Sequence, residues 1–438
     1  MKIRAKVSNL PHIFLGDTLM NSRERARKAI NHQETDRIPL DLGSTLVTGI
    51  QASTYAKLRQ SLGLKDKAVS IADPFQMLGE VDLEVIGKLG IDTIGLWLPT
   101  NVFGFKNENW KPWKLFDGTK VMVPEKFTIK RDDEGNIYLY PQGDMSVPPC
   151  AKMPQNGYYF DLLVRQESFN ERNLNPEDWA NQQYSIFSED TLRYLENRAD
   201  DLYKNTDLCI VGEFIDASFG TFSMVLGPDI KYPKGIRDPV QWITAHILYP
   251  DYIKGIFELQ CEIALKNLQL SYEAVGNKID VIYVSGTDFG TQNAPFISPN
   301  MYREFYKPFH KRINDWIHKN TSWKTFYHSC GSIATFLDDF VEAGVDILNP
   351  VQTSAKDMDP KRLKERYGDK LVFWGGGVDT QRTLPFGTPE EVRKEVNERC
   401  QIFGKGGGFV FNTIHNIQSK VPIENLVAMF QAIREFKF

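Results

Sequence analysis

The residues best suited to chemistry are a histidine and a cysteine separated by one residue, His328 and Cys330. An imidazole and a thiolate are ligands that zinc prefers, so this pair suggests a metal site. Two ligands alone are a weak signal, and a buried cysteine beside a hydrogen-bonded histidine is an equally good interpretation. A third ligand must come from elsewhere, and His415 is the best candidate. A His/Cys/His set would leave one position of a tetrahedral zinc ion open, as catalytic zinc requires.

The polar run that contains Asp288 is a second candidate for chemistry. Its carboxylate could orient a metal ligand or act as a general base, and the alternative is that it caps a helix or a turn. We predict that Asp288 and His415 are the catalytic residues. The other histidines considered, His246, His310 and His318, are interpreted as surface or packing residues.

Four further residues are predicted to bind the substrate: Asn349, Gln352, Gly376 and Asp379. Each follows a short apolar run that is predicted to be a strand. The three glycines at 375–377 would let the backbone pass close to a ligand or to a neighbouring loop. Asp379 could equally be the N-cap of a short helix.

The elements that must position these residues are eight short, nearly continuous apolar runs with helical patterns between them. Such runs are typical of parallel strands covered on both faces. Eight alternations of strand and helix predict an α/β fold of the TIM (β/α)8 barrel type, with an open Rossmann-like sheet as the alternative. No G-x-G-x-x-G motif supports that alternative. The predicted strands are 38–43, 92–97, 208–213, 281–286, 324–328, 345–349, 371–375 and 409–413.

Helix starts also have clear signals, at Asn21, Ser298-Pro299 and Thr388-Pro389, and residues 391–403 form one amphipathic pattern. In a barrel of this type, functional groups lie at the carboxyl ends of the strands. The residues after the fifth and eighth strands, which include His328, Cys330 and His415, would then face each other across one mouth.

Residues 101–205 interrupt the pattern between the second and third strands. We predict a large insertion there, with a β-hairpin around the DDEGN turn, on a single barrel that spans residues 1–438. It would sit at the carboxyl mouth and partly cap the substrate, although a surface elaboration without substrate contact is equally compatible.

The composition excludes several classes of protein. The 438 residues are 42% hydrophobic and 25% charged with a net charge of −4, so neither extensive disorder nor a basic nucleic-acid surface is expected. No run approaches the about 18 apolar residues of a membrane span, and residues 1–28 do not resemble a signal peptide. Five scattered cysteines favour a reduced, cytoplasmic environment over a disulfide framework.

These motifs resemble the uroporphyrinogen decarboxylase superfamily, whose barrel also serves corrinoid-dependent methyltransferases. The resemblance runs from about residue 21 to 436, with the insertion as its main departure. It rests on the opening NSRERARKAINHQETDRIP, the ISPNMYREFYKPFHKRI helix, YHSCG, GVDILNPVQ, WGGGVDT, GTPEEV and the closing FNTIHNIQSKVPIENLVAMF.

The two branches of the superfamily imply different activities. The methyltransferases carry H-x-C and a later cysteine that together bind zinc; His328 and Cys330 match the first part, but His415 stands where the cysteine belongs. The decarboxylases have a histidine there, in a segment much like residues 412–415. They also carry arginines after the first strand and an aspartate at the end of the second, where this chain has DLGST at 41–45 and WLPT at 97–100.

The resemblance therefore implies a zinc-dependent methyltransferase that moves a methyl group between a small substrate (a methyl ether, methylamine or thiol) and a corrinoid. The chain has no D-x-H-x-x-G cobalamin motif, so the corrinoid is expected on a separate protein. No nucleic acid or membrane partner is expected, and a homodimer is possible. The alternatives are a cofactor-free uroporphyrinogen decarboxylase and a barrel that binds a ligand without catalysis.

Overall fold

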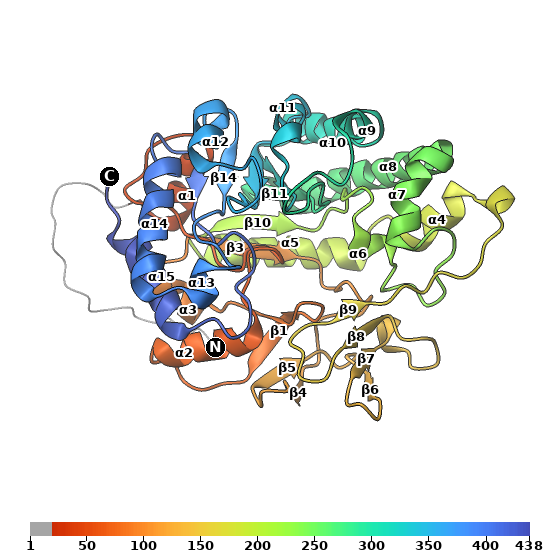
Figure 1. The fold of residues 1–438 in the computed structure, drawn as a ribbon, viewed down its shortest axis with the longest axis horizontal. Helices are drawn as coiled ribbons and strands as arrows, with labels where there is room; N and C mark the ends of the chain where they lie inside the picture. The colour runs from red at the N-terminus through yellow and green to blue at the C-terminus, as the bar shows by residue number, and fades with distance from the viewer. Residues whose placement is uncertain (1–19) are drawn as a thin grey trace.

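The computed structural model describes residues 20–438, so the expectation about a signal peptide falls largely outside the described residues. Its centre is a curled sheet of seven parallel strands (Figure 1). Their order is β15-β14-β13-β12-β11-β10-β3, and every neighbouring pair is parallel. The bounds are β3 (Thr93–Trp97), β10 (Cys209–Glu213), β11 (Val281–Ser285), β12 (Lys324–His328), β13 (Ile347–Asn349), β14 (Val372–Trp374) and β15 (Phe409–Val410).

The predicted first strand, 38–43, is not a regular strand, and this part of the prediction was wrong. It survives as one parallel bridge between Leu40 and Phe411, just beyond β15. On its other side, the Asp92 N–H donates to the Leu40 carbonyl at 2.8 Å, so the segment joins β15 to β3 and closes the barrel. Pro39 has no N–H, and the Leu40 N–H donates to the Asp92 side chain at 2.9 Å. Neither residue therefore donates a backbone hydrogen bond to a neighbouring strand.

Helices cover the outside of the barrel, and their starts follow the predicted signals. Asn21 with Glu24 and Thr388 with Glu391 form capping boxes, and the hydroxyl of Ser298 caps a third helix. The longer helices are α1 (Ser22–Ile30), α2 (Ala52–Ser61), α5 (Glu189–Asn205), α7 (Pro239–Leu248), α8 (Pro250–Val275), α10 (Lys307–Asn320), α14 (Pro389–Phe403) and α15 (Ile423–Glu435). The shorter ones are α3 (Leu83–Leu89), α4 (Pro176–Gln183), α6 (Phe222–Val225), α9 (Pro299–Phe305), α11 (Leu337–Glu342), α12 (Pro360–Tyr367) and α13 (Thr383–Phe386).

The predicted insertion contains most of two small sheets that lie together on one side of the barrel (Figure 1). The first has the order β2-β1-β5-β4, and its β1 and β2 come from before residue 101, which the sequence analysis did not foresee. The second has the order β6-β7-β8-β9 and includes the predicted hairpin. The bounds are β1 (Val69–Asp73), β2 (Leu78–Gly79), β4 (Lys111–Lys114), β5 (Lys120–Val123), β6 (Ile129–Arg131), β7 (Ile137–Leu139), β8 (Ala151–Met153) and β9 (Asp161–Leu162).

The end of the insertion returns to the barrel, since α5 packs against α8 and β3. The division of the chain into a barrel and a cap at 101–205 stays a prediction. The barrel interior is filled by side chains of the strands, among them Val211, Val281, Phe326 and Trp374. None of the described helices is both long and apolar enough to cross a membrane.

Candidate metal centre and cavity

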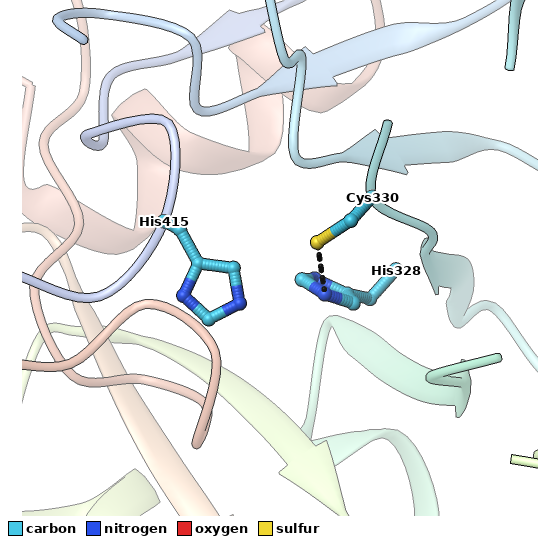
Figure 2. A group of neighbouring side chains, drawn as sticks. All are labelled: His328, Cys330 and His415. Atoms are coloured by element: carbon cyan, nitrogen blue, oxygen red, sulfur yellow. Dashed lines mark hydrogen bonds between the residues drawn. The ribbon is translucent and has the colours of Figure 1, made fainter. Parts of the chain in front are cut away.

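Three predicted ligands converge at the carboxyl end of the barrel. His328 is the last residue of β12, Cys330 follows it, and His415 lies in the loop after β15. One ligand atom from each lies within 4.8 Å of the other two. Figure 2 shows a ring nitrogen of His415 on the side that faces His328 and Cys330.

The orientation of His328 suits a metal ligand. Its Nδ1 lies 2.6 Å from Oδ1 of Asn349, so Nδ1 carries the proton and Nε2 keeps a free electron pair. The Sγ of Cys330 lies 3.3 Å from this Nε2. Two ligands at ordinary Zn–N and Zn–S distances around a tetrahedral ion are about 3.5 Å apart. The spacing of His328 and Cys330 therefore fits one shared ion.

His415 has a different hydrogen-bond arrangement. The backbone N–H of Asn416 donates to its Nδ1 at 2.7 Å. A neutral ring in this arrangement carries its proton on Nε2, the nitrogen on the side of His328. His415 can therefore donate a hydrogen bond as it stands, and it can ligate a metal through Nε2 only after that proton moves.

Burial controls the protonation of these groups. It lowers the pKa of His328 to about 4 and, together with the nearby His328, lowers the pKa of His415 to about 4. Both rings are thus neutral near pH 7, as ligands must be. Burial, reinforced by the charge of Asp288, raises the pKa of the Cys330 thiol well above its usual value. A bound cation would reverse that effect, because metal coordination displaces the thiol proton.

Asp288 lies beside the three ligands. Its Oδ1 accepts the Cys330 N–H at 2.7 Å and lies 3.8 Å from Nε2 of His328. Burial raises the pKa of this carboxyl. Asp288 therefore holds the Cys330 backbone in place and keeps the same oxygen near the ligand nitrogen of His328.

The four residues predicted to bind the substrate lie in different environments. Asn349 contacts His328 and donates to the Trp374 carbonyl at 2.8 Å, so both ends of its amide are engaged. Gln352 accepts the Gly331 N–H at 2.7 Å and lines a cavity of about 410 Å³ together with Cys330 and His415.

Gly376 and Asp379 are not among the described residues that line a cavity at this end of the barrel. Gly376 has a φ of +78°, and a Cβ there would lie 2.8 Å from Val351, so this glycine is required for packing. Asp379 accepts the Gln381 N–H at 2.7 Å and the Arg382 N–H at 3.2 Å, which matches its alternative interpretation as a cap. A substrate role for these two residues stays a prediction.

His328 and His415 also line a larger cavity of about 710 Å³. Parts of the predicted insertion line it, including Asn101, Val102 and Tyr184, as the cap hypothesis requires. The sequence analysis missed four acids of its lining, which are Asp73, Glu213, Asp216 and Asp229. Glu213 carried a readable signal, because it ends a buried strand at the functional face of the barrel.

Comparisons with known proteins agree with the α/β barrel architecture. Residues 234–436 match the family model described as uroporphyrinogen decarboxylase (URO-D). The resemblance to the uroporphyrinogen decarboxylase superfamily inferred from the motifs is thereby confirmed.

Individual relatives match over shorter stretches. The chain is 28% identical to uroporphyrinogen decarboxylase of Psychromonas ingrahamii over 143 residues, which are 32% of this chain and 38% of that protein. It is 38% identical to the enzyme of Pseudoalteromonas translucida over 73 residues, which are 17% of this chain and 20% of that protein. The matched part thus spans well under half of these relatives.

The fold as a whole is similar to a solved structure described as a methyltransferase from Methanosarcina mazei. The superposition has a TM-score of 0.56 and covers 95% of this chain and 99% of the other, at 16% sequence identity. At this identity the likeness establishes the barrel fold, and the activity has to be argued from the site.

Proposed function

We propose that the protein is a zinc-dependent methyltransferase that moves a methyl group between a small substrate and a corrinoid carried by a separate protein. The observation that carries this proposal is the convergence of His328, Cys330 and His415 within 4.8 Å at the barrel mouth. The likeness in fold to the Methanosarcina mazei methyltransferase supports the same branch.

The residues at the site fit zinc through a mixed nitrogen and sulfur set. His328 and Cys330 would form its fixed part, because their ligand atoms already have a suitable spacing. His415 would be the third ligand after its proton moves from Nε2, and Asp288 would orient Cys330. When bound there, zinc would act as a Lewis acid that lowers the pKa of a substrate thiol or polarises an ether oxygen.

The chain's own residues would then define the reaction environment. Asn349 would keep His328 in one tautomer. The site borders both cavities, since His415 lines the two of them. We propose that the substrate occupies the larger cavity and that the corrinoid approaches from the open mouth.

The decarboxylase alternative is disfavoured by the lining of the larger cavity. A polycarboxylated tetrapyrrole requires cationic groups to hold its acetate and propionate side chains. None of the described residues that line either cavity is a lysine or an arginine. A substrate with many carboxylates would instead face acids, which supply no positive charge to its side chains.

Metal analysis of the purified full-length protein tests the proposal. We expect about one zinc per chain, and we expect Cys330→Ala to remove most of it. The matched control is Cys261→Ala, which deletes a buried thiol from α8, far along the chain from the three ligands. Equal zinc content in wild type and Cys330→Ala, or no zinc in either after loading, would overturn the proposed site.

A further inference from the structure

The larger cavity has an unusual balance of charge. Its lining includes five carboxyl groups and, among the described residues, no lysine or arginine. Buried carboxylates are normally paired with a cation or fully hydrogen-bonded. The five acids are Asp73, Glu213, Asp216, Asp229 and Asp288.

Two of these acids, Glu213 and Asp216, are only partly satisfied. Glu213 accepts one hydrogen bond, from the Leu46 N–H at 2.8 Å, through Oε2. Asp216 accepts a long contact of 3.4 Å from the Gln260 amide and is further stabilised by the backbone N–H of Ser218. Among the described residues neither forms a salt bridge, whereas Asp229 has Arg165 and Arg237 nearby. Burial raises the pKa of Glu213 to about 8 and that of Asp216 to about 7, and the nearby acids Asp73 and Asp229 add to the two shifts.

A tyrosine provides an independent indication that a ligand belongs here. Tyr283 of β11 lines the same cavity, and only 8% of its surface is exposed. Its hydroxyl has no hydrogen-bond partner among the described residues and is not sealed from the cavity, so it is free to bond to a ligand there. The phenol lies within electrostatic range of Glu213, Asp216, Asp288 and Cys330. It therefore lies near both Glu213 and Asp216 and the candidate metal centre.

Six aromatic residues also contribute to the lining of the cavity. Rings that line a cavity attract a cation through the negative potential of their faces, and methylated ammonium groups are often bound in this way. Acids without counter-ions provide the complementary charge. The aromatic lining residues are Phe75, Tyr184, Phe187, Phe214, Phe222 and Tyr283.

We propose that this cavity binds a substrate that carries a positively charged amine, with the ammonium group held by Glu213 and Asp216 and a polar group bonded to Tyr283. The inference rests on the proposed function, because the reacting group of the same molecule would lie at His328, Cys330 and His415. It also restricts the substrates of that function to cations, because anionic and purely apolar substrates would leave the charges of the ionised acids without a partner.

Binding of a charge series to the metal-free protein tests this inference apart from the metal chemistry. The probes are choline, its neutral isostere 3,3-dimethyl-1-butanol and the anion 3,3-dimethylbutanoate, titrated by calorimetry at pH 8.5 into chelator-treated full-length protein. We expect choline to bind at least about tenfold more tightly than the neutral isostere and the anion not to bind.

Variants test whether the preference for choline depends on Glu213, Asp216 and Tyr283. The double variant Glu213→Gln and Asp216→Asn is expected to bind choline and the neutral isostere equally, and Tyr283→Phe is expected to weaken choline binding several-fold. Asp190→Asn, which removes an exposed acid of α5 outside the cavity lining, is expected to bind choline as wild type does. Thermal unfolding of each variant identifies any loss of fold.

Equal wild-type affinities for choline and the neutral isostere, or tighter binding of the anion, would overturn the inference. So would an undiminished preference for choline in a folded double variant. The proposed function would survive such a result if the protein still bound zinc through Cys330. Conversely, the protein could prefer choline and yet bind no zinc. That result would contradict the proposed function and still support the inference that the cavity binds ammonium groups.

Discussion

The Oδ1 of Asn349, at the end of β13, lies 2.6 Å from Nδ1 of His328, at the end of β12. The two strands are neighbours, and their register pairs these two residues directly. The other end of the amide donates to the Trp374 carbonyl on β14. Three consecutive strand ends thus determine which nitrogen of His328 faces the candidate metal centre.

Replacing Asn349 should therefore weaken metal binding without removing a ligand. We expect Asn349→Ala to lower zinc affinity roughly 10- to 100-fold, because His328 loses the acceptor that selects its tautomer. The free energy of unfolding should fall by about 1–3 kcal/mol, since a buried carbonyl loses its donor. Competition with a chromogenic chelator and denaturant unfolding measure the two effects.

Asn425 offers a matched control for this variant. It is also a buried asparagine, and its amide donates to the Leu384 and Gly387 carbonyls away from the metal centre. Asn425→Ala should lose similar stability and keep wild-type zinc affinity. A comparable loss of zinc affinity in both variants would mean that Asn349 acts only through the stability of the fold.

The cation cavity should respond to pH in a defined direction. With the pKa of Asp216 at about 7 and that of Glu213 at about 8, both acids are largely protonated at pH 6 and ionised at pH 9. Choline should thus bind more tightly as the pH rises through this range, because only the ionised acids attract it. The charged or titratable groups near the pair are Asp73, Tyr184, Asp229 and Tyr283.

Calorimetric affinities at pH 6, 7, 8 and 9 check this prediction. The double variant Glu213→Gln and Asp216→Asn serves as the control and should show a much flatter dependence. Choline affinity that falls as the pH rises would contradict the assignment of the two acids as the cation-binding groups.

Uroporphyrinogen should not be a substrate. Among the described residues the lining of the larger cavity has no lysine or arginine, so the carboxylates of this tetrapyrrole would lack a permanent cation to pair with. Incubation under reducing, anaerobic conditions should yield no coproporphyrinogen above the uncatalysed level by chromatography. Formation at an enzymatic rate would favour the decarboxylase alternative over methyl transfer.

The sequence predicted those parts of the fold that depend on local signals. The strands β10, β11 and β12 were predicted to within one residue, because apolar runs and neighbouring turns mark them clearly. The capping boxes at Asn21 and Thr388 were readable for the same reason. The irregular segment around Leu40 was predicted as a full strand, since its bond to the side chain of Asp92 depends on a residue far along the chain.

The candidate site also has a part that the sequence predicts and a part that it does not. His328 and Cys330 share one strand end, so their proximity follows from the motif itself, and His415 required the barrel topology as well. Four of the five cavity acids were missed, because residues such as Asp73 and Glu213 come from distant segments that meet only in the folded chain. Likewise, the proton position on His415 depends on the backbone N–H of Asn416, which no sequence pattern reveals.

The most direct test of the central claim is X-ray absorption at the zinc edge of the zinc-loaded protein. A site made by His328, Cys330 and His415 predicts one sulfur at about 2.3 Å and nitrogens at about 2.0–2.1 Å from zinc. The sulfur shell should disappear in Cys330→Ala and remain in Cys261→Ala. A wild-type spectrum without sulfur, or a sulfur shell that persists in Cys330→Ala, would contradict the proposed metal centre.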